Sequence, residues 1–208
     1  MEKLDSSKLE NVLEDVRKSY RLLALYQQRL LDIVKYIGNK YNQEFNSGWA
    51  KFSKHMNNGN RAKIDAWSWD WLTMYLYEFN MGHREIGEHE YWFKIVHQAD
   101  TGFYDKEKTE RIQKTEIDQF ETAEKSKSRL FLVLSRSEGC PKKNLLSKHL
   151  SSVSDGLVHN GDWMAVPYDM KRFIDKQSTD KVLKEFNSKV LSYFNVEILP
   201  EVEPIAQK

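Results

Sequence analysis

The sequence contains one cysteine, Cys140, and few prolines and glycines among its 208 residues. A single cysteine cannot form an internal disulfide and offers too little sulfur for a cysteine-based zinc site. Four prolines, nine glycines and an aromatic share of 12% also differ from a disordered chain, which lacks the apolar surface that offsets ordering entropy. We therefore expect a folded protein of a reducing compartment, and the cytoplasm is the predicted localisation.

Long hydrophobic runs and an excess of one charge are also missing. No apolar run approaches the roughly 18 residues that a membrane span needs, and the chain begins with polar and charged residues, unlike a signal peptide. Lys and Arg total 32 against 31 Asp and Glu, so the net charge is +1. The sequence thus predicts a soluble protein with no membrane partner, and any polyanion binding has to come from a local basic patch.

A heptad pattern between residues 9 and 41 predicts one long helix. Its apolar positions are separated by alternating steps of four and three residues, with one polar break at Gln27. These positions are Leu9, Leu13, Val16, Tyr20, Leu23, Leu30, Val34, Ile37 and Tyr41. Ser7 and Glu10 have the spacing of a capping box, which predicts the helix start there, and from Leu22 onward the apolar stripe widens. We expect the second half of the helix to pack on the protein and the first half to meet a second copy, which predicts a homo-oligomer.

The rest of the chain shows strand and helix patterns in turn. Residues 71–79 and 91–98 have period-2 patterning rich in aromatics, which predicts an antiparallel hairpin with a longer loop at 81–88; a helix at 67–79 is the alternative. The apolar run 130–134 is typical of a central strand buried on both faces. Further predicted elements are a loop or short helix and turn at 43–65, an exposed helix at 106–127, a helix at 145–153, a strand at 163–166, a helical turn at 168–175 and a helix at 180–194.

This order of elements predicts the fold class and the division of the chain. The class is α+β, with a long N-terminal helix and several shorter helices packed on a small mixed or antiparallel sheet. We assign residues 1–45 to the long helix as a self-association element, 46–196 to an α+β body and 197–208 to a flexible tail.

Three carboxylates, Glu78, Asp100 and Asp105, are the candidate catalytic residues. Period-2 counting places Glu78 on the aliphatic face of its strand, where a buried acid needs a partner such as Lys94 or Lys127. Carboxylates that hold a metal beside a lysine that orients water would form a nuclease-like site. The alternative is that Glu78 lies at the strand end, already in solvent.

The tripeptide Asp100-Thr101-Gly102 also spells the triad of aspartic proteases, in which two Asp side chains share a proton and activate water. That family has a strongly apolar strand before the triad and a small residue after it, whereas here Gln98 precedes and Phe103 follows. The alternative is a turn that leaves the second strand, because Asp and Gly tolerate turn geometry.

The loop of the predicted hairpin holds histidines and acids of the kind that bind a divalent metal. The candidate metal ligands are His83, Glu88, His89 and, further along the chain, His97. Their spacing matches no helical or knuckle arrangement of ligands, so a solvated turn is the alternative. We predict no bound metal and no cofactor.

Basic residues are concentrated in two segments, one at 125–148 and one at 51–63, where Lys51, Lys54, Arg61 and Lys63 are interleaved with aromatic residues. Residues 125–148 contain seven Lys or Arg against Glu138 alone, a charge of 7 − 1 = +6. Basic side chains neutralise phosphates and aromatic rings stack on unpaired bases, so the two segments would bind single-stranded nucleic acid if they lay together. The candidate binding residues are Trp49, Lys51, Lys54, Trp67, Lys125, Lys127, Arg129, Lys142 and Lys143. The alternative is that the charges lie on solvated faces and the aromatic side chains in the core.

The functional prediction rests on the long heptad stripe and on the lack of a complete catalytic set. We predict an intracellular, non-enzymatic interaction protein, regulatory or inhibitory, that self-associates through its long helix and binds a protein partner through an aromatic-rich surface. A nucleic-acid-binding protein, or a metal-dependent nuclease with a carboxylate cluster and a basic patch, is the alternative.

Overall fold

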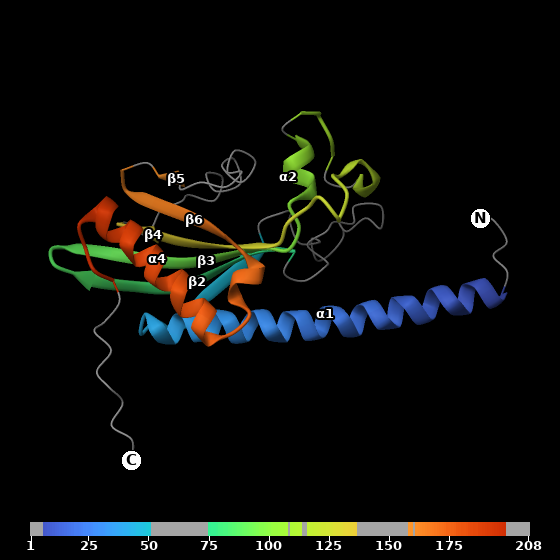
Figure 1. Cartoon of the computed structure of the whole chain (residues 1–208), viewed down its shortest axis with the longest axis horizontal. Helices are drawn as coiled ribbons and strands as arrows, with labels where there is room; N and C mark the ends of the chain where they lie inside the picture. Colours follow the sequence, from blue (N-terminus) through green and yellow to red (C-terminus); the bar gives the residue numbers. More distant parts are fainter. Residues whose placement is uncertain are drawn as a thin grey trace, which may run out of the picture.

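The computed structural model describes residues 6–50, 75–107, 109–113, 116–136, 158–159 and 161–198. The elements are α1 (Ser6–Lys40), β1 (Ser47–Ala50), β2 (Leu76–Ile86), β3 (His89–Gln98), α2 (Gly102–Glu107), η2 (Ile117–Gln119), β4 (Arg129–Ser135), β5 (Val158–His159), β6 (Trp163–Asp169), η3 (Met170–Phe173) and α4 (Lys176–Phe194). The described strands form one six-stranded sheet in the order β1-β2-β3-β4-β6-β5, with every neighbouring pair antiparallel. The predicted α+β class is confirmed (Figure 1).

Helix α1 changes its surroundings halfway along its length. Its second half lies against the sheet, whereas its first half extends past the rest of the described chain (Figure 1). In the second half, the heptad residues Leu30, Val34 and Ile37 are buried in the core. The helix ends at Lys40, and two residues later Asn42 turns the chain back in the left-handed conformation with φ of 50°. The same heptad stripe is therefore part of the core at one end of α1 and faces solvent at the other.

The two faces of the sheet are covered differently. The first face packs against the second half of α1 and against α4, and together they form the larger core. The second face packs against α2 through Phe103 and Tyr104. The apolar residues on this second face of the sheet are Leu76, Val96, Phe131, Val133, Trp163 and Ala165. Alternating side chains point to opposite faces of a strand, so β2, β3, β4 and β6 each contribute residues to both cores.

Strand β4 runs through the middle of the sheet, between β3 and β6. All seven of its residues, Arg129–Ser135, are buried, which confirms the central, doubly buried strand predicted at 130–134. The predicted strand at 163–166 is also confirmed, as β6, and the predicted turn at 168–175 contains η3. The helix predicted at 180–194 is α4, which begins four residues earlier, at Lys176, because the side chain of Asp175 accepts a hydrogen bond from Ser178 N (2.7 Å) and caps it there.

Two predictions about the middle of the chain are wrong. The hairpin has no long loop at 81–88: β2 continues to Ile86 and a short turn at Gly87 joins it to β3. Gly82 does not end the strand, because it lies with φ of 89° at a shift in the strand register. The helix predicted at 106–127 is also absent in the part of that range that the structure describes, where only the end of α2 and the short η2 are helical.

Several predictions fall outside the described residues. They concern the strand start at 71–74, the helix at 145–153 and the side chains of Lys51, Lys54, Trp67, Lys142 and Lys143. Among the helices that the structure describes, α1 included, none has a segment apolar and long enough to cross a membrane.

Candidate interaction surfaces

The first half of α1 is a projecting helix whose apolar side chains face solvent. We call residues 11–25 the α1 arm; all of them are exposed. On the heptad stripe, Leu13, Val16 and Leu23 retain 42%, 44% and 41% of their accessible surface and Tyr20 retains 68%, whereas Leu30, one heptad beyond Leu23, retains 0%. A soluble monomer rarely leaves a contiguous apolar patch of this kind in water, so the α1 arm is a candidate interaction surface.

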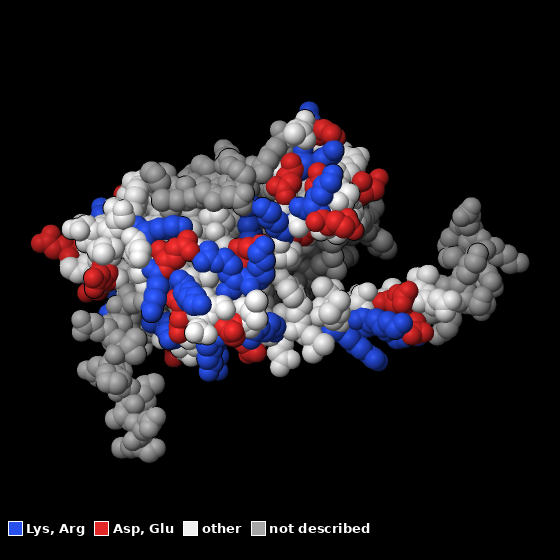
Figure 2. Space-filling view, in the orientation of Figure 1, with Lys and Arg blue, Asp and Glu red and all other residues white. Residues whose placement is uncertain are grey.

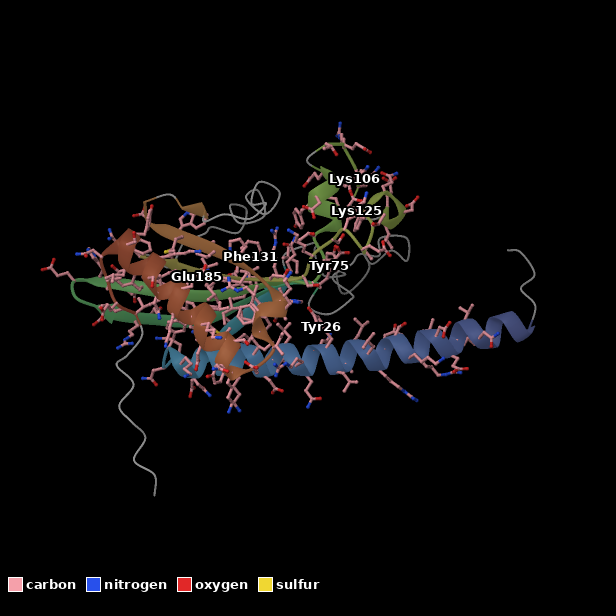
Figure 3. The ribbon with its side chains drawn as sticks, in the orientation of Figure 1. Tyr26, Tyr75, Lys106, Lys125, Phe131 and Glu185 are labelled. Atoms are coloured by element: carbon pink, nitrogen blue, oxygen red, sulfur yellow. The ribbon has the colours of Figure 1, made fainter. Side chains whose placement is uncertain are left out.

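The body holds α1 from Tyr26 onward. The Tyr26 hydroxyl is hydrogen-bonded to His97 Nε2 on β3 (2.7 Å), and Figure 3 shows Tyr26 where α1 leaves the sheet. Burial raises the pKa of the Tyr26 phenol, and a hydrogen bond with Ser128 partly offsets the rise. Three residues on, Arg29 Nη2 donates to the carbonyl of Phe173 (3.0 Å). The arm therefore begins where α1 loses its contacts with the body.

An apolar groove runs beside the second half of α1. Its walls are α1, the segment that follows Asn42 and strand β2, and its volume is about 570 Å³. Its apolar lining consists of Leu31, Val34, Phe45, Tyr77, Phe79 and Met81. Leu31 and Phe45 are exposed by 46% and 54%. Lys35, Asn39, Gln43 and Glu44 form the polar part of the lining. We refer to this site as the apolar groove. The sequence patterns do not predict it, because its walls come from segments that are distant in the sequence.

The second face of the sheet contains a buried ion pair. Glu78 on β2 and Lys94 on β3 retain only 2% and 8% of their surface, and Lys94 Nζ lies 3.2 Å from Glu78 Oε1. Trp49 on β1 is directly opposite Glu78 in the strand register, so it lies on the same face. The structure thus places Glu78 inside the protein, as period-2 counting indicates, and the alternative of a solvated strand end is wrong.

The three candidate catalytic carboxylates are not brought together. Asp100 lies four residues beyond Val96, the register neighbour of Glu78, which is a separation of about 13 Å along a strand. Asp100 Oδ1 accepts a hydrogen bond from Gly102 N (2.7 Å), as expected of the turn alternative. Asp105 is half-buried on α2. Within the described ranges, no three His, Cys, Asp or Glu side chains lie close enough to hold a metal ion.

The histidine candidates also lie apart. His83 is exposed near the hairpin tip, with Nε2 3.2 Å from Glu90 Oε1 and its ring against Trp92. Glu88 and His89 are exposed at the turn. His97 is fully buried and lies eight residues beyond His89 on β3, about 25 Å along the strand. His83, Glu88 and His89 are exposed, as the solvated-turn alternative expects. His97 is instead hydrogen-bonded to Tyr26 of α1.

One candidate nucleic-acid contact is inside the protein. Arg129 retains 5% of its surface, donates from Nε to Gln98 Oε1 (2.7 Å) and lies over the ring of Phe131. Its prediction as an exposed phosphate contact is therefore wrong. Lys125 and Lys127 are exposed, and Lys125 is near Glu121, 3.6 Å away, at the α2 end of the molecule (Figure 3).

Another set of basic side chains, not considered in the sequence interpretation, covers η3 and α4, where acidic side chains lie between them (Figure 2). Arg172 and Lys189 both contact Glu185, at 2.7 and 2.8 Å. Lys40 of α1 likewise contacts Asp180, at 3.1 Å. These contacts describe a surface of paired charges, and the local excess of positive charge is correspondingly small.

The comparisons with known proteins return one family. The model of the PM0109 family matches residues 6–193, which include both the α1 arm and the sheet. No curated protein matches the chain, and no solved structure matches it.

Proposed function

The chain belongs to the PM0109 family, and for this member we propose a non-enzymatic role as an interaction protein, regulatory or inhibitory, that self-associates through the α1 arm and binds a protein partner through an aromatic-rich surface. The proposed function involves no cofactor and no metal.

The exposed stripe on the α1 arm is the observation that carries the proposal. Leu13, Val16, Tyr20 and Leu23 are each exposed by two-fifths or more. Full burial of such a side chain contributes about 1.5 to 3 kcal/mol, so covering the exposed half of four of them contributes roughly 3 to 6 kcal/mol per copy. Association itself costs about 4 to 15 kcal/mol. Burial of the stripes of both copies thus contributes roughly 6 to 12 kcal/mol, which is similar to the cost of association, so a stable dimer needs further contacts beside the stripe.

The aromatic-rich surface that we assign to the protein partner is on the second face of the sheet. Trp49 on β1 and Trp92 on β3 are both half-buried. Trp92 Nε1 donates to Glu90 Oε2 (3.1 Å), which fixes the edge of its ring. Tryptophan is enriched at the centre of protein interfaces because it combines a large apolar area with one hydrogen-bond donor.

The polar groups of the described residues support a binding role over a catalytic one. Glu78 is bonded to Lys94, and Asp100 is bonded within its own turn. A general acid or base has to reach a substrate atom within hydrogen-bond distance, whereas these carboxylates lie in separate places and already have structural contacts.

Light scattering of the purified protein at micromolar concentration tests self-association. We expect a dimer mass or a larger one for the wild type and a monomer mass for Leu13→Glu, because a charge in the stripe cannot be buried without a partner. Leu22→Glu is the matched control: Leu22 is on the same helix and exposed by 68%, but it lies on the opposite side from Leu13. A monomer mass for the wild type, unchanged in Leu13→Glu, would contradict the proposal.

A further inference from the structure

Exposed apolar residues of the α1 arm lie on the same side of α1 as a residue that lines the apolar groove. Leu13 and Tyr20 are seven residues apart, and Tyr20 and Leu31 are eleven apart. Seven and eleven residues correspond to about two and three turns of an α-helix. The three side chains therefore lie on one side of α1, and Leu31 is part of the groove lining. An exposed apolar path thus leads from the arm into the groove.

The groove and the arm are both apolar, and the groove is concave where the arm is convex. The groove is hollow, and six of its lining residues are apolar. The arm is convex and carries the exposed apolar side chains Leu13, Val16 and Tyr20. Within one chain the arm cannot enter the groove, because α1 is one uninterrupted helix (Figure 1) and residues of its other half line the groove. The arm of a second copy has no such restriction.

A closed pair of such contacts fixes the direction of the helices. A two-fold axis across α1 makes the two helices antiparallel, so that the first half of each lies beside the second half of the other. If the middle of the arm stripe, between Val16 and Tyr20, lies opposite Leu31 of the second copy, the axis passes near Ala24. Ala24 lies on the same side of α1 as Leu13 and Leu31, and its small side chain allows the two helices to approach closely.

The charges beside the stripe agree with this register. With the axis near Ala24, Glu14 of one copy is level with Lys35 of the other, and Arg17 is level with Asp32. Flanking positions on the same side of the stripe face each other in an antiparallel helix pair, so both pairs have opposite charges. In a parallel pair, Arg17 would instead face the uncharged Val12. Charge complementarity therefore favours the antiparallel arrangement.

We infer that two copies of this chain form a symmetric dimer in which the α1 arm of each copy occupies the apolar groove of the other, with the two α1 helices antiparallel about an axis near Ala24. This inference rests on the self-association proposed above and specifies its geometry. It also gives the groove an occupant, the arm of a second copy.

Cysteine cross-linking of the full chain tests the geometry. In a Cys140→Ser background, Ala24→Cys is expected to form a disulfide with itself across the axis, and Val16→Cys mixed with Leu31→Cys is expected to form a mixed disulfide. Val16→Cys alone is expected not to cross-link. A dimer in which Val16→Cys cross-links with itself and Ala24→Cys does not would overturn the arm-in-groove geometry and leave self-association standing. A monomer mass would overturn both.

A second pair of variants separates the groove from the arm. Leu31→Glu puts a charge into the groove and leaves the arm stripe intact, and we expect it to raise the dimer dissociation constant by roughly tenfold or more. Leu22→Glu, on the opposite side of α1, is expected to leave that constant unchanged. Circular dichroism checks that both variants remain folded. An unchanged dissociation constant for Leu31→Glu in a folded protein contradicts the inference.

Discussion

Glu78 and Lys94 form an ion pair on the second face of the sheet, where both side chains are almost fully buried. Two charges in such a place lose their hydration, and their attraction compensates for that loss only while both are present. Asn80, two residues along β2 from Glu78, donates to Ser47 Oγ (3.3 Å), so a second polar contact joins β1 to β2 on this face. The pair thus joins β2 to β3 at a place where neither side chain is replaceable alone.

We predict that Lys94→Met destabilises the protein by about 3 to 5 kcal/mol, because it removes the ammonium group that lies 3.2 Å from the buried Glu78 carboxylate. The double variant Glu78→Leu with Lys94→Met is expected to lose less stability than the sum of the two single variants. Urea unfolding measures all three. Lys106→Met is the control, since Lys106 forms an exposed pair with Glu110 (2.7 Å) and its loss is expected to have little effect. Additive effects of the two buried substitutions would show that the pair is not coupled.

For single residues, the sequence predicts the features that depend on the alternation of side chains along one strand. The alternation of β2 places Glu78 on the buried face, and the need of a buried acid for a cation makes Lys94 a candidate partner. The bond between Tyr26 and His97 is not predictable in the same way, because it joins residues 71 positions apart and depends on how α1 docks on the sheet. The charge of Arg129 alone predicts an exposed side chain, whereas its guanidinium lies over the Phe131 ring and donates to Gln98.

At Gly38 the close packing around helix α1 favours glycine, although helix propensity favours alanine. The residue lies in α1, and a Cβ built on it would come within 2.6 Å of Met81 Cε and 2.7 Å of the Gln43 carbonyl oxygen. The methionine side chain can move, but the carbonyl belongs to the backbone that folds back beneath the helix: Gln43 N donates to the Gly38 carbonyl (2.9 Å). The glycine therefore allows the chain to turn closely after α1.

We predict that Gly38→Ala destabilises the protein by about 1 to 3 kcal/mol, as overpacking does. Helix propensity alone gives the opposite sign, since alanine is more favourable than glycine in a helix by about 1 kcal/mol. Asn39→Ala, at the neighbouring exposed position, is the control and is expected to be neutral or slightly stabilising. Thermal unfolding of both variants measures the difference. A stabilised Gly38→Ala variant would mean that the turn after α1 adjusts freely.

Elements with a strong and uninterrupted pattern were predictable from the sequence. The heptads gave α1, the apolar run gave β4, and the amphipathic spacing gave α4. One error arose because glycine occurs both in loops and at bulges within strands. Gly82 and Gly87 suggested a long loop, but the first occupies a bulge within β2 and the second a short turn, with φ of 89° and 62°. The scarcity of turn formers and the helical spacing of apolar residues such as Ile112 and Phe120 favour a helix at 106–127, whereas Phe120 packs on Phe103 of the second core.

For the whole molecule, the balance of charge bears on the choice between the proposed function and the nucleic-acid alternative. The net charge is +1, the basic side chains over α4 are interleaved with acidic ones (Figure 2), and Arg129 is buried. We predict that the protein elutes from heparin and from single-stranded DNA at low salt, because strong retention requires many unpaired basic groups facing the phosphates. Chromatography over a salt gradient makes this measurement.

Strong retention that falls steeply with salt would favour the nucleic-acid alternative. The variant Lys142→Glu, Lys143→Glu, Lys148→Glu then distinguishes the two basic regions. Retention that disappears in this variant would assign the binding to the 125–148 segment. Retention that persists would direct attention to the surface over η3 and α4.

The place of β4 in the sheet has a consequence for how the chain folds. A short turn joins β2 to β3, whereas residues 99–128 separate β3 from β4 and residues 136–162 separate β4 from β6. Contacts between segments that are close in sequence form early, whereas long-range pairing has to overcome the entropy of closing a long loop. The β2–β3 hairpin is thus the part of the sheet that we expect to form first, and the pairings of β4 with β3 and with β6, which both close long loops, are expected to follow it.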